Sequence, residues 1–305
     1  MSSIRTGRTH VGRTLAGRTR AGRRGAWTVR LALGVVAVVA VLAVAGPALA
    51  PYDPLAQDTA HALIGSSPDH LLGTDYLGRD VLARLLAGAP ASLLSALAAT
   101  LLGLLTGALP GALSAFLPRV GEWLALRIVD ALLALPFILF AIVFAALLGN
   151  GLVQATTAIG LLLAPGFFRV SRAATLRVRD AQYVEAATLL GASAWWILGR
   201  HVWRQVAPTL VIAAISSLGA ALLAVASLTF LGIGVQPPAP TWGGMLASDL
   251  GYLAQRPEGP LAPALAIVIT VGALNLLADA VRDRLGDAAP RRIRTRSTRK
   301  ETADA

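Results

Sequence analysis

Six stretches of mostly apolar residues, each about long enough to cross a lipid bilayer, constrain the fold of this chain more than any other feature. A membrane-spanning α-helix needs about 20 such residues. The stretches cover residues 31–50, 92–117, 124–148, 152–170, 207–231 and 262–281. Of the 305 residues, 55% are hydrophobic and only 14% are charged, whereas a soluble domain carries about 25% charged residues. The sequence therefore predicts an all-α polytopic membrane protein with six transmembrane helices.

Basic residues are distributed unevenly between these stretches. All but three of the 27 Lys and Arg lie in residues 1–30, 118–127, 169–206 and 282–305. The three exceptions are Arg79, Arg84 and Arg256, in residues 51–91 and 232–261. Because basic residues concentrate in the cytoplasmic loops of membrane proteins, we expect both termini to be cytoplasmic and Gly149–Gly151 to be a tight turn outside.

The N-terminal 30 residues contain Gly-Arg-Thr three times at intervals of five residues. Such a repeat has no apolar face to bury, so we expect residues 1–30 to form a disordered basic cytoplasmic tail. A topology anchor that attracts anionic lipid headgroups is favoured over a role with nucleic acid. The first apolar stretch also resembles a secretory signal with a cleavage site at Ala48-Leu49-Ala50. Its run of about 19 residues exceeds the 7–15 of a signal, which favours an uncleaved span.

The sequence lacks the residues that several kinds of functional site require. The chain has no Cys, and its four His are far apart without the spacing of a metal site. Its only lysine is Lys300, so it has no P-loop, which requires Gly-Lys-Ser/Thr. Asp130 and Asp279 lie near the ends of their stretches, where Arg127 and Arg282 can offset them at a helical spacing of three. We expect no cofactor, no metal and no catalytic residue; an intramembrane enzyme is the disfavoured alternative.

Residues 171–206, between the fourth and fifth stretches, predict two short helices joined by a turn. Gly191 should end a first helix over 181–190, because glycine readily adopts the left-handed cap conformation. Ser193 can then cap a second helix from about Ala194. The first helix carries Tyr183, Glu185, Ala186 and Ala187. Taken alone, these residues also fit an amphipathic surface helix with a solvated Glu185.

The first segment expected outside contains the motif His70–Asp80, with Gly73, Thr74, Asp75, Gly78, Arg79 and Asp80. Thr74 or Asp75 can cap a helix, and Asp75 and Arg79 form a favourable pair four residues apart. An apolar face begins at Val81. We therefore expect an amphipathic helix at the membrane surface that leads into the second span, with structural packing favoured over ligand contact.

The second segment expected outside contains the motif Phe230–Met245, with Gly234, Gln236, Pro237, Pro238 and Trp242. Its prolines stiffen the chain toward polyproline II, and its glycines permit tight turns. Two interpretations stay open. One is a rigid loop, bearing a Trp, that docks a partner or covers a pore mouth; the other is a re-entrant loop that only fills an outer vestibule.

The sequence Glu185-Ala186-Ala187 with Gly191, together with the two outer motifs, resembles the permeases of binding-protein-dependent ABC importers, and in particular their dipeptide/oligopeptide/nickel branch. This resemblance runs from about residue 66 to 285. It implies a type I ABC importer permease core at 92–285, an N-terminal span and outer loop at 31–91, and a basic cytoplasmic tail at 286–305. It also makes 171–206 the cytoplasmic coupling loop, which docks into an ATPase subunit.

The resemblance implies the channel-forming subunit of an ATP-driven importer of di- or oligopeptides, crossing the plasma (inner) membrane several times. The implied partners are a second permease subunit, two ATPase subunits and an extracytoplasmic solute-binding protein. Nickel or another small solute is the alternative within the same branch. The chain departs from the family at Trp203-Arg204, where Leu-Pro is usual, so the second loop helix can continue toward the fifth span.

Overall fold

The computed structural model describes residues 12–235 and 237–287, and the regular elements of this part are helices. The long helices are α1 (Gly12–Ala45), α2 (Val81–Ser114), α5 (Leu152–Arg179), α8 (Trp203–Phe230) and α10 (Leu261–Asp287). The shorter helices are α3 (Arg119–Ala134), α4 (Phe137–Leu148), α6 (Gln182–Leu189), α7 (Ala194–Ile197) and α9 (Trp242–Leu250). Short 3₁₀ turns cover Gly46–Leu49 and Thr59–His61, and a π-helical turn covers Leu198–Val202.

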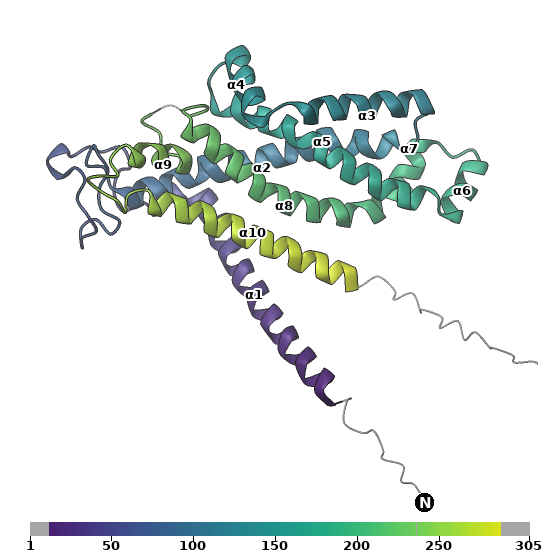
Figure 1. Ribbon diagram of the computed structural model, residues 1–305, viewed down its shortest axis with the longest axis horizontal. Coiled ribbons are helices and arrows are strands. Elements are labelled where there is room, and N and C mark those ends of the chain that lie inside the picture. Colours follow the sequence, from purple (N-terminus) through teal and green to yellow (C-terminus); the bar gives the residue numbers. More distant parts are fainter. Residues whose placement is uncertain (1–11, 236, 288–305) are drawn as a thin grey trace, which may run out of the picture.

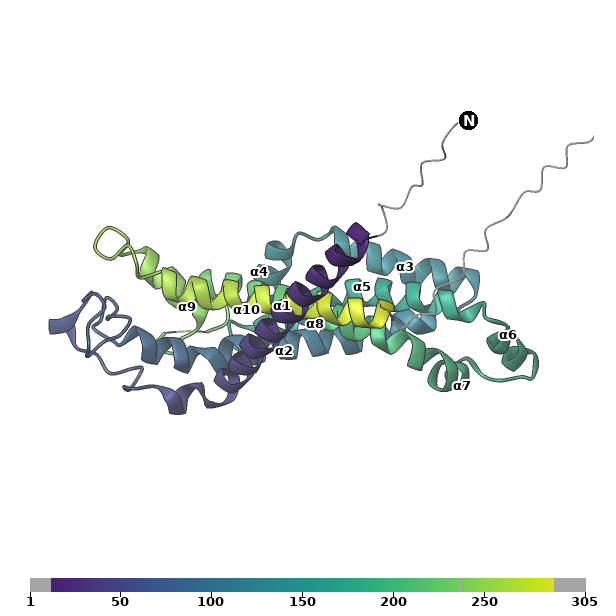
Figure 2. The same cartoon turned by 90° about the horizontal axis from the view of Figure 1, so that it is seen from below.

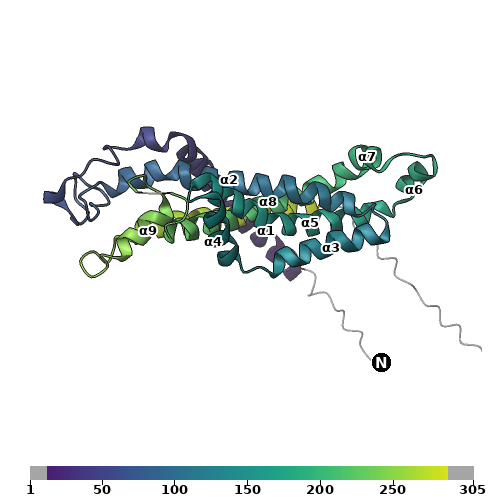
Figure 3. The same cartoon turned by 90° about the horizontal axis from the view of Figure 1, so that it is seen from above.

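Helices α2, α5, α8 and α10 lie lengthwise beside one another and form an elongated bundle (Figure 1). Residues 51–80 and α9 lie at one end, which we call the α9 end, and α6 and α7 project from the opposite α6 end (Figure 3). Among the described helices, five segments are long and apolar enough to cross a membrane: Val29–Leu49, α2, α5, α8 and Leu261–Leu285. The structure is thus that of a helical membrane protein.

Glycine brings α2 and α5 together along much of their length. A side chain added at Gly107 would place its Cβ 2.1 Å from the carbonyl oxygen of Ala164, and one at Gly111 would lie 2.4 Å from that of Phe168. Gly103 meets α5 in the same way one turn earlier. Small residues at this spacing allow two helix backbones to approach closely in lipid, where packing rather than hydrophobicity drives association. The core of the bundle is therefore built on this helix pair.

Helix α2 is longer than the sequence predicts, because the expected surface helix and the second span are one continuous helix. It begins at Val81, and Asp80 caps it by accepting a hydrogen bond from the backbone N–H of Ala83 at 2.7 Å. The prediction that Thr74 or Asp75 caps this helix was therefore wrong. At about 1.5 Å per residue its 34 residues extend roughly 50 Å, well beyond the hydrocarbon core of about 30 Å.

The predicted third span, 124–148, is not one continuous helix. It is divided into α3 and α4 at Leu135-Pro136, where Leu135 has the extended backbone angles φ −77° and ψ 126°. A residue before proline is driven out of the α region by contact with the proline ring.

The partner of Asp130 also differs from the predicted one. Asp130 pairs with Arg169 of α5 at 2.6 Å, whereas Arg127, the predicted partner, lies over the ring of Trp123.

Helix α1 begins before the first apolar stretch. The sequence predicts a disordered tail over 1–30; in the structure α1 begins at Gly12 and continues into the span, and residues 1–11 lie outside the described part. A helix that already exists extends without a new nucleation cost, and Arg, Leu and Ala favour it. The second half of α1 packs against α10 and α2, while its first half diverges from the bundle (Figure 1). Seen from below, α1 crosses the bundle obliquely (Figure 2). The tail from residue 288 onward is likewise not described.

Candidate functional site

The segment 171–206 forms the two predicted helices at the α6 end. Helix α6 is followed by Gly191, whose φ of +83° is the left-handed conformation expected of a glycine cap. Ser193 accepts a hydrogen bond from the N–H of Trp196 at 3.3 Å and so caps α7, as predicted. Helix α7 passes through the π-helical turn directly into α8, so the chain continues helical through Trp203-Arg204 as the sequence indicated.

Helix α6 is attached to the bundle along one face and exposed along the other. Val184 is 1% exposed and belongs to an apolar cluster with Ile197 and Val202. Glu185 and Ala186 are exposed. Large apolar side chains gather beside them on the surface: Tyr183, Leu189, Leu190, Trp195 and Trp196. A concentration of exposed apolar side chains around one carboxylate is typical of a protein-interaction surface.

Hydrogen bonds connect this end of α5 to two other helices. Arg172 is buried and binds Ser114 of α2 at 3.1 Å and Glu122 of α3. Arg179 donates to the carbonyl oxygen of Ala115 at 2.6 Å. These charged hydrogen bonds, which are the stronger kind, connect the end of α5 to α3 and to the end of α2.

At the α9 end, residues of the His70–Asp80 motif form hydrogen bonds and ion pairs with one another. Asp75 accepts hydrogen bonds from the Nε of Arg79 at 2.7 Å and from its backbone N–H at 3.0 Å, which confirms the predicted pair. Asp80 binds His70 at 2.9 Å. Gly73 and Gly78 have positive φ angles of +71° and +75°. The motif residues Gly73, Thr74, Asp75, Gly78, Arg79 and Asp80 are all buried.

This motif belongs to a larger buried ionic cluster, which we define as Asp75, Arg79, Arg84, Asp249 and Arg256. Arg84 lies 3.4 Å from Asp75, and Arg256 donates to the carbonyl oxygens of Leu72 and Thr74. Asp249 on α9 is buried, and its Oδ2 has no hydrogen-bond partner among the described residues. Burial raises the pKa of the Asp249 carboxyl to about 6, and the charge of Arg256 opposes this shift.

Sequence reasoning missed this cluster, although a signal for it was present. The three arginines that depart from the overall charge asymmetry are Arg79, Arg84 and Arg256, and they are only 3%, 6% and 5% exposed. Basic residues are uncommon in these two segments, which singles out the three arginines as candidates for structural contacts. In the structure the two segments meet through Arg256, which donates to the carbonyl oxygens of Leu72 and Thr74.

The Phe230–Met245 motif turns at the α9 end. Asn150 accepts a hydrogen bond from the N–H of Gly234 at 2.7 Å and donates to the carbonyl oxygen of Gly232 at 3.2 Å. The turn before α5 therefore lies at the same end. Pro237 and Pro238 are exposed and lie in a turn rather than in the expected extended polyproline II conformation, and Gln236 lies outside the described residues.

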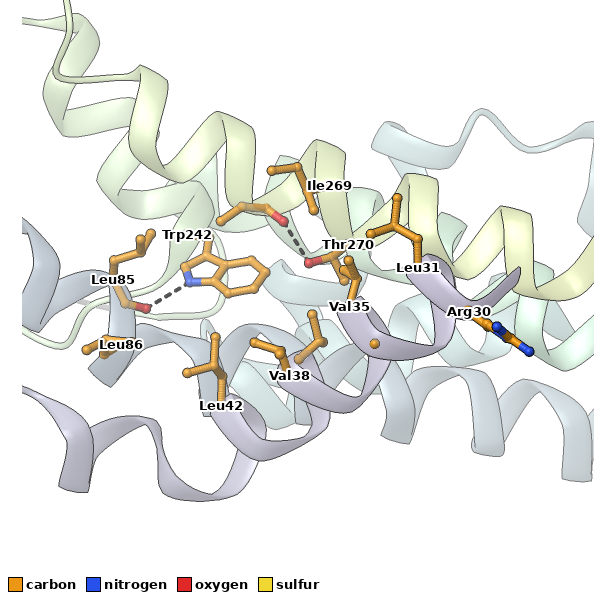
Figure 4. Close-up of a pocket in the computed structure, with 13 residues that line it drawn as sticks. Arg30, Leu31, Val35, Val38, Leu42, Leu85, Leu86, Trp242, Ile269 and Thr270 are labelled. Carbon is orange, nitrogen blue, oxygen red and sulfur yellow. Dashed lines mark hydrogen bonds between the residues drawn. The ribbon is translucent and has the colours of Figure 1, made fainter. Parts of the chain in front are cut away.

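Trp242 is an internal anchor and not an exposed contact. It is 2% exposed, its indole N–H donates to the carbonyl oxygen of Leu85 at 3.0 Å, and its backbone N–H donates to Ser92 at 3.1 Å. Its ring lies at one end of an apolar groove of about 530 Å³ between α1 and α10 (Figure 4). The groove suits lipid or another helix and not a polar solute.

Comparison with known proteins identifies relatives over most of the chain. Residues 99–289 match the family described as binding-protein-dependent transport system inner membrane component. The di/tripeptide transport system permease protein of Pseudomonas aeruginosa is 38% identical over 245 residues, 78% of this chain and 81% of that protein. The glutathione transport system permease protein of Pectobacterium atrosepticum is 36% identical over 221 residues, 72% of this chain and 73% of that protein.

Two further matches agree with these. A probable D,D-dipeptide transport system permease protein of Escherichia coli is 34% identical over 243 residues, 80% of this chain and 82% of that protein. Among solved structures, the MetNI methionine ABC transporter in inward-facing conformations matches with a TM-score of 0.56 and 20% identity. That match covers 66% of this chain and 95% of the other, and it supports the same overall fold.

Proposed function

The chain belongs to the binding-protein-dependent transport system inner membrane components, and from this premise we propose that it forms the channel of an ATP-driven importer of di- or oligopeptides. The observation that carries the proposal is the α6 surface, where Glu185 and Ala186 stand exposed at the end of a membrane bundle. The relatives described above are named for peptides and glutathione, which favours a peptide over nickel.

The proposed orientation places the α6 end in the cytoplasm and the α9 end outside. Segments 51–80 and 232–260, both poor in basic residues, lie together at the α9 end, and the basic segment 171–206 lies at the α6 end. This agreement between charge and structure supports cytoplasmic termini. Helices α3 and α4, in succession, would supply a sixth crossing. The packing of α1 against α10 supports an uncleaved first span.

The proposed partners are a second permease, two ATPase subunits and an extracytoplasmic binding protein. Glu185, Ala186 and Ala187 would enter a cleft of an ATPase, since small residues permit close insertion, and Gly191 would set the bend behind them. Movement of the ATPases would displace α6. Through Arg172 and Arg179, this displacement would reach α2 and α3 and switch the channel between inward- and outward-facing states. The exposed Pro237 and Pro238 would face the binding protein.

The proposal is tested by reconstituting the complex in vesicles and measuring peptide uptake and ATPase activity. Wild-type complex should import peptide only with ATP and binding protein. Glu185→Ala should weaken the coupling of hydrolysis to uptake by roughly 5- to 150-fold, because a buried partner group left unpaired costs about 1–3 kcal/mol.

The matched control is Asp69→Ala, which removes an exposed carboxylate at the opposite end of the molecule. Uptake by this variant should stay near the wild-type value, since an exposed charge contributes little. The absence of peptide uptake by wild-type complex contradicts the proposed function. Normal uptake by Glu185→Ala, at normal abundance, contradicts the coupling role of α6.

A further inference from the structure

A small polar pocket lies at the α9 end, between the beginning of α2, the last turn of α8, the 232–241 segment and α9. Its volume is about 160 Å³. The described residues that line it include no carboxylate. They do include two arginines and four side chains with hydroxyl groups, namely Arg79, Arg84, Tyr76, Thr229, Thr241 and Ser248. We call this cavity the arginine pocket.

The two arginines share one carboxylate. Arg79 binds Asp75 at 2.7 Å through its Nε, and the Nε of Arg84 lies 3.4 Å from the same carboxylate oxygen. One Nη of Arg84 donates to the carbonyl oxygen of Pro54 at 3.1 Å. The two Nη groups of Arg79 and the other Nη of Arg84 have no hydrogen-bond acceptor among the described residues.

Burial makes this shortage of acceptors significant. Arg79 is 3% exposed and Arg84 is 6% exposed. Asp75 offsets both guanidinium charges and Arg79 also lies over the ring of Tyr76, so the pocket offers spare N–H donors and not an unpaired charge. Asp249 is the next carboxylate of the cluster, but it does not line the pocket and its Oδ2 accepts no hydrogen bond in the described structure. The pocket thus presents unused guanidinium donors to whatever enters it.

We propose that the arginine pocket binds a free carboxylate of the transported peptide as the peptide enters the channel. A guanidinium presents its N–H groups in a planar fork that matches a carboxylate. The hydroxyl of Thr241 accepts a hydrogen bond from the N–H of Gly244 and keeps its own hydrogen for a ligand, whereas Thr229 and Ser248 already donate to carbonyl oxygens of their own helices. The volume corresponds to about five water molecules at roughly 30 Å³ each, which accommodates a terminal carboxylate and adjoining atoms but not a whole tripeptide. This inference rests on the proposed function.

The solutes that appear in the names of the relatives favour a peptide carboxylate as the occupant of the pocket. Di- and tripeptides, D,D-dipeptides and glutathione differ in length, chirality and linkage, but each carries a free carboxylate. A channel subunit that admits varied peptides gains selectivity from the group that they share. Exposed Pro237 and Ala239 border the pocket, so a solute released at the outer surface reaches it directly.

The experiment compares a dipeptide with its C-terminal amide, each at a concentration that saturates the binding protein. Uptake by reconstituted wild-type complex should favour the free acid. In Arg84→Gln and Arg79→Lys, the ratio of the uptake rate of the acid to that of the amide should fall about tenfold, because a hydrogen bond to a charged group is among the stronger ones. Dividing by the wild-type ratio removes the selectivity of the binding protein itself.

Arg256→Gln is the matched control, because Arg256 belongs to the same ionic cluster but does not line the pocket. It should lower the uptake of both peptides equally and leave the ratio unchanged. Equal uptake of acid and amide by wild-type complex overturns the inference, and so does an unchanged ratio in either pocket variant.

Other outcomes identify a different occupant or a different failure. In one such outcome, the pocket variants lose the same share of uptake for both peptides and need more binding protein for half-maximal ATPase activity. This outcome also overturns the inference. It indicates that the pocket binds an acidic group of the binding protein. If wild-type complex takes up neither peptide, it is the proposed function that fails.

Discussion

Asp249 shows how burial of a single residue makes the α9 end sensitive to pH. The pKa of its carboxyl is raised from an ordinary value near 3.8 to about 6, chiefly by burial. Between these two values the folded protein holds a proton that the unfolded chain releases. Stability gained from this group is therefore fully present below about pH 4 and is lost as pH rises through 6.

We predict that Asp249→Asn removes this dependence. The difference in thermal midpoint, wild type minus variant, should become more negative from pH 4.5 to 7.5 in detergent-solubilised protein followed by intrinsic fluorescence. Gln255→Ala, which changes an exposed residue without a titratable group at the same end, should give a difference that varies little with pH. A constant or rising difference for Asp249→Asn would contradict the assignment.

Local residue relationships were predictable from the sequence, and distant ones were not. The pairing of Asp75 with Arg79 and the cap at Gly191 follow from spacings of a few residues. Arg256 instead binds carbonyl oxygens that are 182 and 184 residues away in the chain, and no periodicity relates positions so far apart. The burial of Trp242 was missed for the same reason, since Leu85 is 157 residues before it.

At the scale of elements, the contact between α2 and α5 depends on glycine more than on large apolar side chains. Three glycines one turn apart on α2 leave no room for a Cβ against the α5 backbone. A larger side chain there has to separate the helices, which removes dispersion contacts along both of them.

We predict that Gly107→Leu strongly lowers the thermal midpoint of the purified protein and its amount in the membrane. Overpacking of a tight core costs about 1–3 kcal/mol or more, and here the obstacle is a carbonyl oxygen of the backbone, which cannot rotate away. Gly166→Leu on α5 is the control, because a Cβ at Gly166 meets no atom within 4 Å. Equal stability of the two variants would refute the close packing of α2 on α5.

Apolar length predicted where most of the helices lie but not where they begin or break. Five of the six stretches correspond to long helices. The exception is 124–148, which contains Pro136. A proline disfavours helix at the residue before it, but the high hydropathy of the whole stretch led to the prediction of one continuous span. The apolar stretch from residue 92 marks only the later part of α2, which begins at Val81, where the predicted surface helix joins the span.

At the scale of the whole molecule, the two ends of the bundle should lie on opposite sides of the membrane. The chain contains no Cys, so single cysteines can be introduced without further changes. Gln57→Cys and Ala239→Cys, both exposed at the α9 end, should react with an impermeant thiol reagent added to intact cells. Gln182→Cys and Asp283→Cys, also exposed, should react only after the membrane is permeabilised. Reaction of Gln182→Cys in intact cells would reverse the proposed orientation.

The hydrogen bonds from Arg256 to Leu72 and Thr74 also set an order of events during synthesis. A ribosome adds about 5–20 residues per second, so Arg256 is made roughly 10–35 seconds after the residues that it binds, which are 184 and 182 positions earlier. During that interval the His70–Asp80 segment has only its local contacts. The cluster at the α9 end is therefore completed only when Arg256 has been made, long after Asp75, Arg79 and Arg84.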